Sequence, residues 1–158
     1  MRITFRSLAI AIVALVAVQA ASHAWASAGL GLYISNGGVA DASLMTATTP
    51  PFPEVLGFMI HGINGMMVIP VVALALLVVS FFVKVGGAIR WAAITLGLVA
   101  LQVTLGMLGH GLPALGFLHG VNALVLASAA MYTQSLTTRR LPARPAERRA
   151  TEDTPLHV

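Results

Sequence analysis

The chain contains Leu56-Gly57-Phe58-Met59-Ile60-His61-Gly62-Ile63-Asn64-Gly65, a pattern that recurs one residue shorter as Leu115-Gly116-Phe117-Leu118-His119-Gly120-Val121-Asn122-Ala123. Both copies stand at the start of a long apolar run. Polar side chains at membrane depth are costly and are usually functional. Two matched histidines on two matched helices therefore suggest one ligand held between the helices.

Composition places the chain in a membrane. Of its 158 residues, 58% are hydrophobic and 9% are charged, whereas about a quarter of the residues in a soluble domain are charged. There is no cysteine, which excludes disulfides, thiolate-held iron–sulfur clusters, covalent c-type haem and a cysteine nucleophile. Any metal must be held by histidine, methionine, carboxylate or backbone groups.

Four apolar stretches are long enough to span a bilayer, which takes about 20 residues. They cover residues 8–33, 55–83, 88–110 and 114–136. The predicted fold is an all-α transmembrane four-helix bundle over residues 1–136. Pro70 lies inside the second span and is expected to kink it, because proline cannot bond to the carbonyl of Met66.

Charge indicates the orientation of the spans. Every Lys and Arg falls on one predicted side: Arg2, Arg6, Lys84, Arg90, Arg139, Arg140, Arg144, Arg148 and Arg149. The positive-inside rule then predicts a multi-pass protein of a bacterial plasma membrane with both termini in the cytoplasm. Residues 137–158 are polar and predict a disordered cytoplasmic tail.

The first span has a second interpretation. Arg2, Arg6, the apolar core and Ala24-Trp25-Ala26 are also typical of a cleaved signal peptide. Apolarity that continues through Leu32 favours a retained helix.

The repeat extends backwards along the chain. Leu15-Val16-Ala17-Val18-Gln19 matches Leu98-Val99-Ala100-Leu101-Gln102. We interpret residues 8–83 and 88–136 as a tandem repeat of a two-helix unit, related by an axis along the membrane normal. Such symmetry predicts that His61 and His119 face one another at equal depth, roughly 9 Å below the outer helix ends. His23 and His110 are expected in the same outer layer, and His157 in the tail.

Paired imidazoles suit b-type haem. Two histidines on facing helices give a six-coordinate iron, which is typical of electron transfer. Gly62 and Gly120 follow the two ligands, and Asn64 and Asn122 share their helix faces, where they are expected to orient an imidazole or reach a haem propionate. We further expect Gly57 and Gly116 to allow close approach and Phe58 and Phe117 to wall the macrocycle.

Other assignments stay open. His23 and His110 are candidates for binding haem propionates or lining a quinone pocket, or they serve only as hydrogen-bonding groups. Met59 near His61, and Met107 near His110, suggest a copper site as an alternative, since thioether and imidazole suit copper. Glycine and asparagine also serve plain helix packing. No nucleophile–base set, phosphate loop or nucleic-acid signature is present, and whether the protein is an enzyme stays open.

With these residues in view, the chain resembles one four-helix half of haem A synthase, and also small uncharacterised four-span bacterial proteins. Gln102-Val103-Thr104-Leu105-Gly106, Pro113 and His119 follow the order typical of that family. The resemblance implies haem ligation by His61 and His119. It does not extend to haem oxidation, because Phe58 stands where the family has a glutamate, and the family's external cysteine pair is absent.

The sequence therefore predicts a small membrane protein that binds b-type haem near the outer face and passes electrons between a donor, such as a quinol, and a partner. The alternative is a non-catalytic accessory subunit of a larger respiratory or transport complex. A homo-oligomer is compatible with either function.

Overall fold

The computed structural model describes residues 1–45 and 47–138, and every regular element in these ranges is helical. The long helices are α1 (Arg2–Ser35), α4 (Ala88–Gly109) and α5 (Pro113–Ser135). Between α1 and α4, the second span is built from α2 (Leu56–Ile63), a π-helical turn (Asn64–Val68) and α3 (Ile69–Ser80). Two short 3-10 turns occupy Ala42–Met45 and Pro53–Val55.

Four helical segments are long and apolar enough to cross a membrane: Arg2–Ser35, Pro53–Ser80, Ala88–Gly109 and Pro113–Ser135. The four predicted spans are thus confirmed as helices, with ends that differ by a few residues; the largest difference is at the start of α1. Large apolar side chains such as Val71 and Leu124 are exposed on the outside of the bundle. An outer surface of this kind is expected where lipid replaces water as the solvent.

A π-helical turn interrupts the second span where Pro70 was expected to kink it. The amide of Ile69 donates to the carbonyl of Asn64, five residues back. Pro70 has no N–H to bond to Met66, so the normal α-helical pattern cannot continue through this turn. Single π turns occur often at functional sites, and this one begins three residues after His61.

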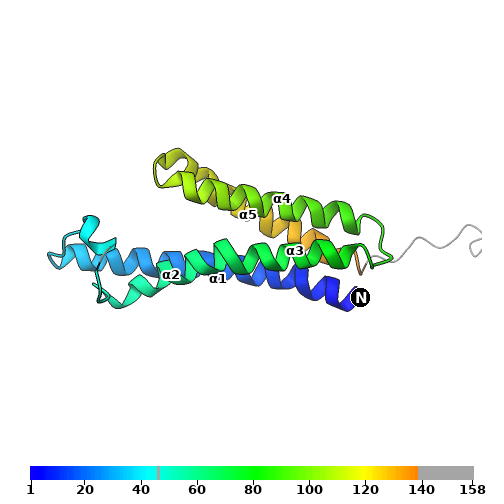
Figure 1. Cartoon of the computed structure of the whole chain (residues 1–158), viewed down its shortest axis with the longest axis horizontal. Helices are drawn as coiled ribbons and strands as arrows, with labels where there is room; N and C mark the ends of the chain where they lie inside the picture. The colour runs from blue at the N-terminus through cyan, green and yellow to red at the C-terminus, as the bar shows by residue number, and fades with distance from the viewer. Residues whose placement is uncertain (46, 139–158) are drawn as a thin grey trace, which may run out of the picture.

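The bundle consists of two helix pairs that diverge toward one end (Figure 1). In the first pair α1 packs against α2 and α3, and in the second α4 packs against α5. Contacts of α1 with α5 and of α3 with α4 join the two pairs. The buried core lies in the half nearer the N-terminus and includes Phe5, Ala9, Ile12, Ala73, Leu76, Ala92, Val99, Leu126 and Ala130.

The connections between helices match the predicted breaks. Gly87 adopts a left-handed conformation with φ of 81° directly before α4, which glycine adopts without a steric penalty. The guanidinium of Arg2 donates to the carbonyl of Lys84 at 3.1 Å, so the start of α1 is tied to this turn. At the other end, Pro113 occupies the first position of α5.

The described residues include the first two residues of the predicted tail, Thr137 and Thr138, and none beyond them. Residues 139–158, with five of the arginines and His157, lie outside the described ranges, so the predicted disorder of the tail stays a prediction.

Candidate functional site

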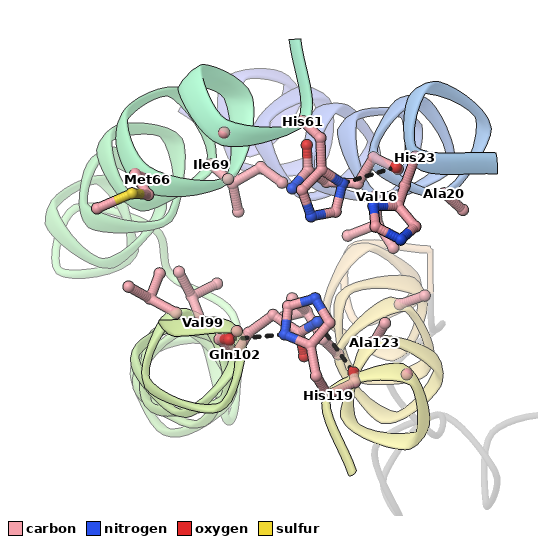
Figure 2. A pocket seen from close by; sticks show the side chains of 18 of the residues that line it. Val16, Ala20, His23, His61, Met66, Ile69, Val99, Gln102, His119 and Ala123 are labelled. Carbon is pink, nitrogen blue, oxygen red and sulfur yellow. Dashed lines mark hydrogen bonds between the residues drawn. The ribbon is translucent and has the colours of Figure 1, made fainter. Parts of the chain in front are cut away.

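An apolar cavity of about 450 Å³ lies between the two helix pairs, in the half away from the buried core. Figure 2 shows His61 and His119 pointing toward one another across it, with His23 beside His61. The size falls within the range of about 300–1,000 Å³ that is typical of small-molecule and cofactor sites. His110, Met66 and Met107 also line this cavity.

His61 is held by the backbone of α1. Its Nδ1 lies 3.0 Å from the carbonyl oxygen of Gln19. A carbonyl oxygen can only accept a hydrogen bond, so Nδ1 carries the proton, and in the neutral imidazole Nε2 then carries a lone pair. Among the described residues, Nε2 of His61 has no hydrogen-bond partner.

His119 repeats this arrangement in the second helix pair. Its Nδ1 lies 2.9 Å from the carbonyl oxygen of Gln102 on α4. The amide of Gln102 in turn donates to the carbonyl of His119 at 3.0 Å. Both histidines therefore have the tautomer found in metal-binding sites, where the ligating imidazole donates its other N–H to a carbonyl or carboxylate.

The two asparagines act on the glutamines and make no hydrogen bond to an imidazole. Asn64 Nδ2 donates to the Leu15 carbonyl and to Gln19 Oε1, each at 3.0 Å. Asn122 Nδ2 donates to the Leu98 carbonyl at 3.0 Å and to Gln102 Oε1 at 2.6 Å.

Both asparagines are buried, with 6% and 7% of their surface exposed, and neither lines the cavity. The expectation that they orient an imidazole directly or reach a haem propionate is therefore corrected. They fix the glutamine whose backbone carbonyl holds the imidazole.

The separation of the two imidazoles fits a single metal centre between them. Their ring centroids are 6.1 Å apart and their planes meet at 52°. An imidazole nitrogen binds a first-row metal at about 2 Å, and this nitrogen lies about 1 Å from its ring centre. Two ligands on opposite sides of one ion therefore place their centroids about 6 Å apart. The ring separation therefore allows one metal ion between His61 and His119.

Glycines shape the space around the two histidines. Gly62 and Gly120 line the cavity, and a Cβ at either position would meet nothing within 4 Å. Their absent side chains leave room beside the ligands.

Gly106 is more restrictive, because a Cβ there would lie 2.9 Å from Cε1 and 3.1 Å from Nδ1 of His119. Gly65 is equally tight, since its Cβ would overlap the Gln19 side-chain amide. Gly106 was not among the predicted site residues, although its position one helical turn after Gln102 was the available signal.

Two groups of predicted neighbours lie away from the cavity. Phe117 is 73% exposed and does not line the cavity, so the expectation that it walls the macrocycle is wrong. A Cβ at Gly57 would overlap the Ser22 carbonyl on α1, and a Cβ at Gly109 would lie 3.0 Å from the backbone of Gly116, whereas a Cβ at Gly116 would meet nothing within 4 Å. Gly57 and Gly109 therefore allow close approach of helices within each pair, and neither Gly57 nor Gly116 lines the cavity.

The His23 ring contacts His61 with centroids 4.9 Å apart and planes tilted by 50°, and Phe58 contacts the His23 ring at 5.6 Å with an edge-on geometry. His110 lies at the end of α4, where its Nδ1 is 3.3 Å from the Met107 carbonyl. Both histidines line the cavity.

Support for a copper site is uneven. Met107 lines the cavity, but Met59 is 58% exposed and does not. Within residues 1–45 and 47–138, no three histidine, cysteine or acidic side chains lie close enough to hold a bare metal ion.

No protein-family model, curated protein or solved structure matches this chain. The resemblance to half of haem A synthase therefore stays a prediction, and the function is inferred from the residues of the cavity.

Proposed function

We propose that this protein is a b-type haem-binding membrane protein of an electron-transfer chain, with His61 and His119 as the two axial ligands. One observation carries the proposal. Two imidazoles face each other across an apolar cavity, each with its Nδ1 proton bonded to a backbone carbonyl and its Nε2 unbonded.

A purely structural role for these histidines explains less. The glutamine and asparagine side chains already link the helices of each pair. If His61 and His119 served packing alone, their Nε2 atoms would have no assigned role, since neither makes a hydrogen bond among the described residues. A guest bound by both Nε2 atoms would use them.

The ligand set favours electron transfer. Haem supplies a reversible one-electron couple, and two axial imidazoles leave no open position for oxygen. In this chain the carbonyls of Gln19 and Gln102 orient the imidazoles. The apolar walls of the cavity exclude water and so tune the redox potential. A membrane quinol as donor and a respiratory complex as acceptor are part of this proposal.

The hydrogen bonds also support the proposed tandem duplication. In each half a histidine donates to the backbone carbonyl of a glutamine. The asparagine three residues after that histidine donates to the side chain of the same glutamine, and also to the backbone carbonyl four residues before the glutamine. Four corresponding groups in one arrangement are hard to obtain from packing alone. With both termini in the cytoplasm, as the positive-inside rule predicts, the cavity lies near the outer face of the membrane.

The alternative is a non-catalytic accessory subunit. It is favoured by the interhelical bonds of Asn64 and Asn122, which are typical of packing in membrane bundles. Copper at the cavity, through Met107 and His110, is a second alternative.

A reduced-minus-oxidised spectrum of protein made with ample haem separates these functions. We expect a haem signal from the wild type. His61→Asn and His119→Asn should each alter or abolish it, because asparagine keeps a donor for the glutamine carbonyl but removes Nε2. His157→Ala, in the tail, is the control and should change nothing. Protein that shows no haem signal would exclude the proposed function and favour the accessory role.

A further inference from the structure

The two helix pairs present their cavity histidines in different arrangements. The first pair contributes His23 and His61, whose rings are in contact, whereas the second contributes His119 from α5 and His110 from the end of α4. His23 follows Gln19 by four residues, and Gly106 follows Gln102 by four, so each lies one turn beyond its glutamine on the same helix face. A histidine in the first half therefore corresponds to a glycine in the second.

His23 differs from His61 and His119 in its hydrogen bonding. Neither of its ring nitrogens has a hydrogen-bond partner among the described residues, while His61 and His119 are tied through Nδ1. Its ring contacts are a tilted contact with His61 at 4.9 Å and an edge-on contact with Phe58 at 5.6 Å. In Figure 2 it stands at the cavity beside His61.

The remaining histidine of the cavity, His110, does not lie against another histidine ring in the part of the chain that the structure describes. His110 is at the end of α4, with its Nδ1 near the Met107 carbonyl. Within residues 1–45 and 47–138, its ring makes no contact with another histidine ring, whereas His61 contacts both His23 and His119. The second helix pair thus offers no neighbour to His119 of the kind that His23 offers to His61.

We infer that His23 is a reserve axial ligand that can replace His61 but cannot replace His119. This inference depends on the proposed haem function. A side chain without hydrogen bonds can move between staggered rotamers at little cost, and His23 and His61 both belong to the α1–α2 side of the cavity. Loss of the His61 ring leaves space into which the neighbouring imidazole can turn, whereas loss of His119 leaves His110 on the α4–α5 side, whose ring contacts no other histidine ring among the described residues.

The experiment compares the spin state of ferric haem in purified variants, measured by electron paramagnetic resonance. The wild type should be low-spin and six-coordinate. His61→Asn should stay predominantly low-spin with shifted g-values, whereas the matched variant His119→Asn should become high-spin. His23→Ala alone should stay low-spin, and the double variant His23→Ala with His61→Asn should become high-spin.

Added imidazole serves as the folding control. It should restore the low-spin signal in His119→Asn and in the double variant if their cavities are intact. If His61→Asn does not fold, His61→Gln provides the same comparison, because glutamine also retains an amide donor.

The outcomes separate this inference from the function on which it depends. A wild type without haem overturns both. A low-spin wild type together with a high-spin His61→Asn overturns the reserve role of His23 and leaves the haem function standing. A high-spin His23→Ala also overturns it, because His23 would then be a primary ligand.

Discussion

Gly106→Ala tests how strictly the structure holds His119. A Cβ at this position would lie 2.9 Å from Cε1 and 3.1 Å from Nδ1 of the imidazole, closer than carbon atoms pack without strain. The ring must therefore move away from α4. That movement weakens its 2.9 Å hydrogen bond to the Gln102 carbonyl.

The expected effect follows from that hydrogen bond. Loss of a partner that orients a metal ligand typically lowers metal affinity by about 10–100-fold, which corresponds to roughly 1.4–2.8 kcal/mol. We expect the haem dissociation constant of Gly106→Ala to rise by this factor, measured by titration of the Soret band in detergent.

Gly97→Ala is the matched control for this variant. Gly97 lies on the same helix, and a Cβ there would meet nothing within 4 Å. Both variants gain helix propensity of about 1 kcal/mol, so a difference in haem affinity isolates the contact with His119. Equal affinities for the two variants would refute the assigned role of Gly106.

Three further predictions concern the stability of the bundle and its orientation in the membrane. Gly65→Ala should lower the unfolding temperature measured by circular dichroism, because the added Cβ would overlap the Gln19 amide. Helix propensity alone favours alanine by about 1 kcal/mol, so a higher unfolding temperature would contradict this prediction. Asn122→Ala should cost about 1 kcal/mol of stability, since it removes hydrogen bonds to Leu98 and Gln102, whereas the exposed Asn36 should tolerate alanine. Because the chain has no cysteine, Asp41→Cys and Lys84→Cys each introduce a single thiol for labelling. An impermeant thiol reagent added to intact cells should label Asp41→Cys and not Lys84→Cys. The reverse pattern would overturn the predicted orientation, in which both termini are cytoplasmic.

Hydropathy alone predicted the helices well. Apolar runs bounded by Gly86-Gly87 and by the segment around Pro113 leave few alternatives to four spans, because lipid requires every backbone group to be bonded within its own helix. The π turn was only partly foreseen. Pro70 indicated that hydrogen bonding must break, but a kink and a π turn satisfy the same constraint, and the neighbouring packing selects between them.

The site was predicted less completely. The duplicated histidine and asparagine correctly pointed to a shared cavity with His61 and His119 facing each other. Helical spacing could not reveal that the asparagines bind the glutamine side chains, because those bonds join different helices. Phe117 was misplaced for a related reason: sequence spacing alone does not show which face of α5 the neighbouring helix covers, and the structure leaves Phe117 73% exposed.

The most direct measurement counts the axial histidines of the bound haem. Wild-type protein can be produced with ample haem and ¹⁵N-labelled histidine, and the ferric state examined by pulsed electron paramagnetic resonance, which detects nitrogen nuclei bonded to iron. The account predicts one low-spin haem per chain with two histidine nitrogens on opposite sides of the iron. A haem with one histidine ligand, or purified protein that binds no haem, would contradict it.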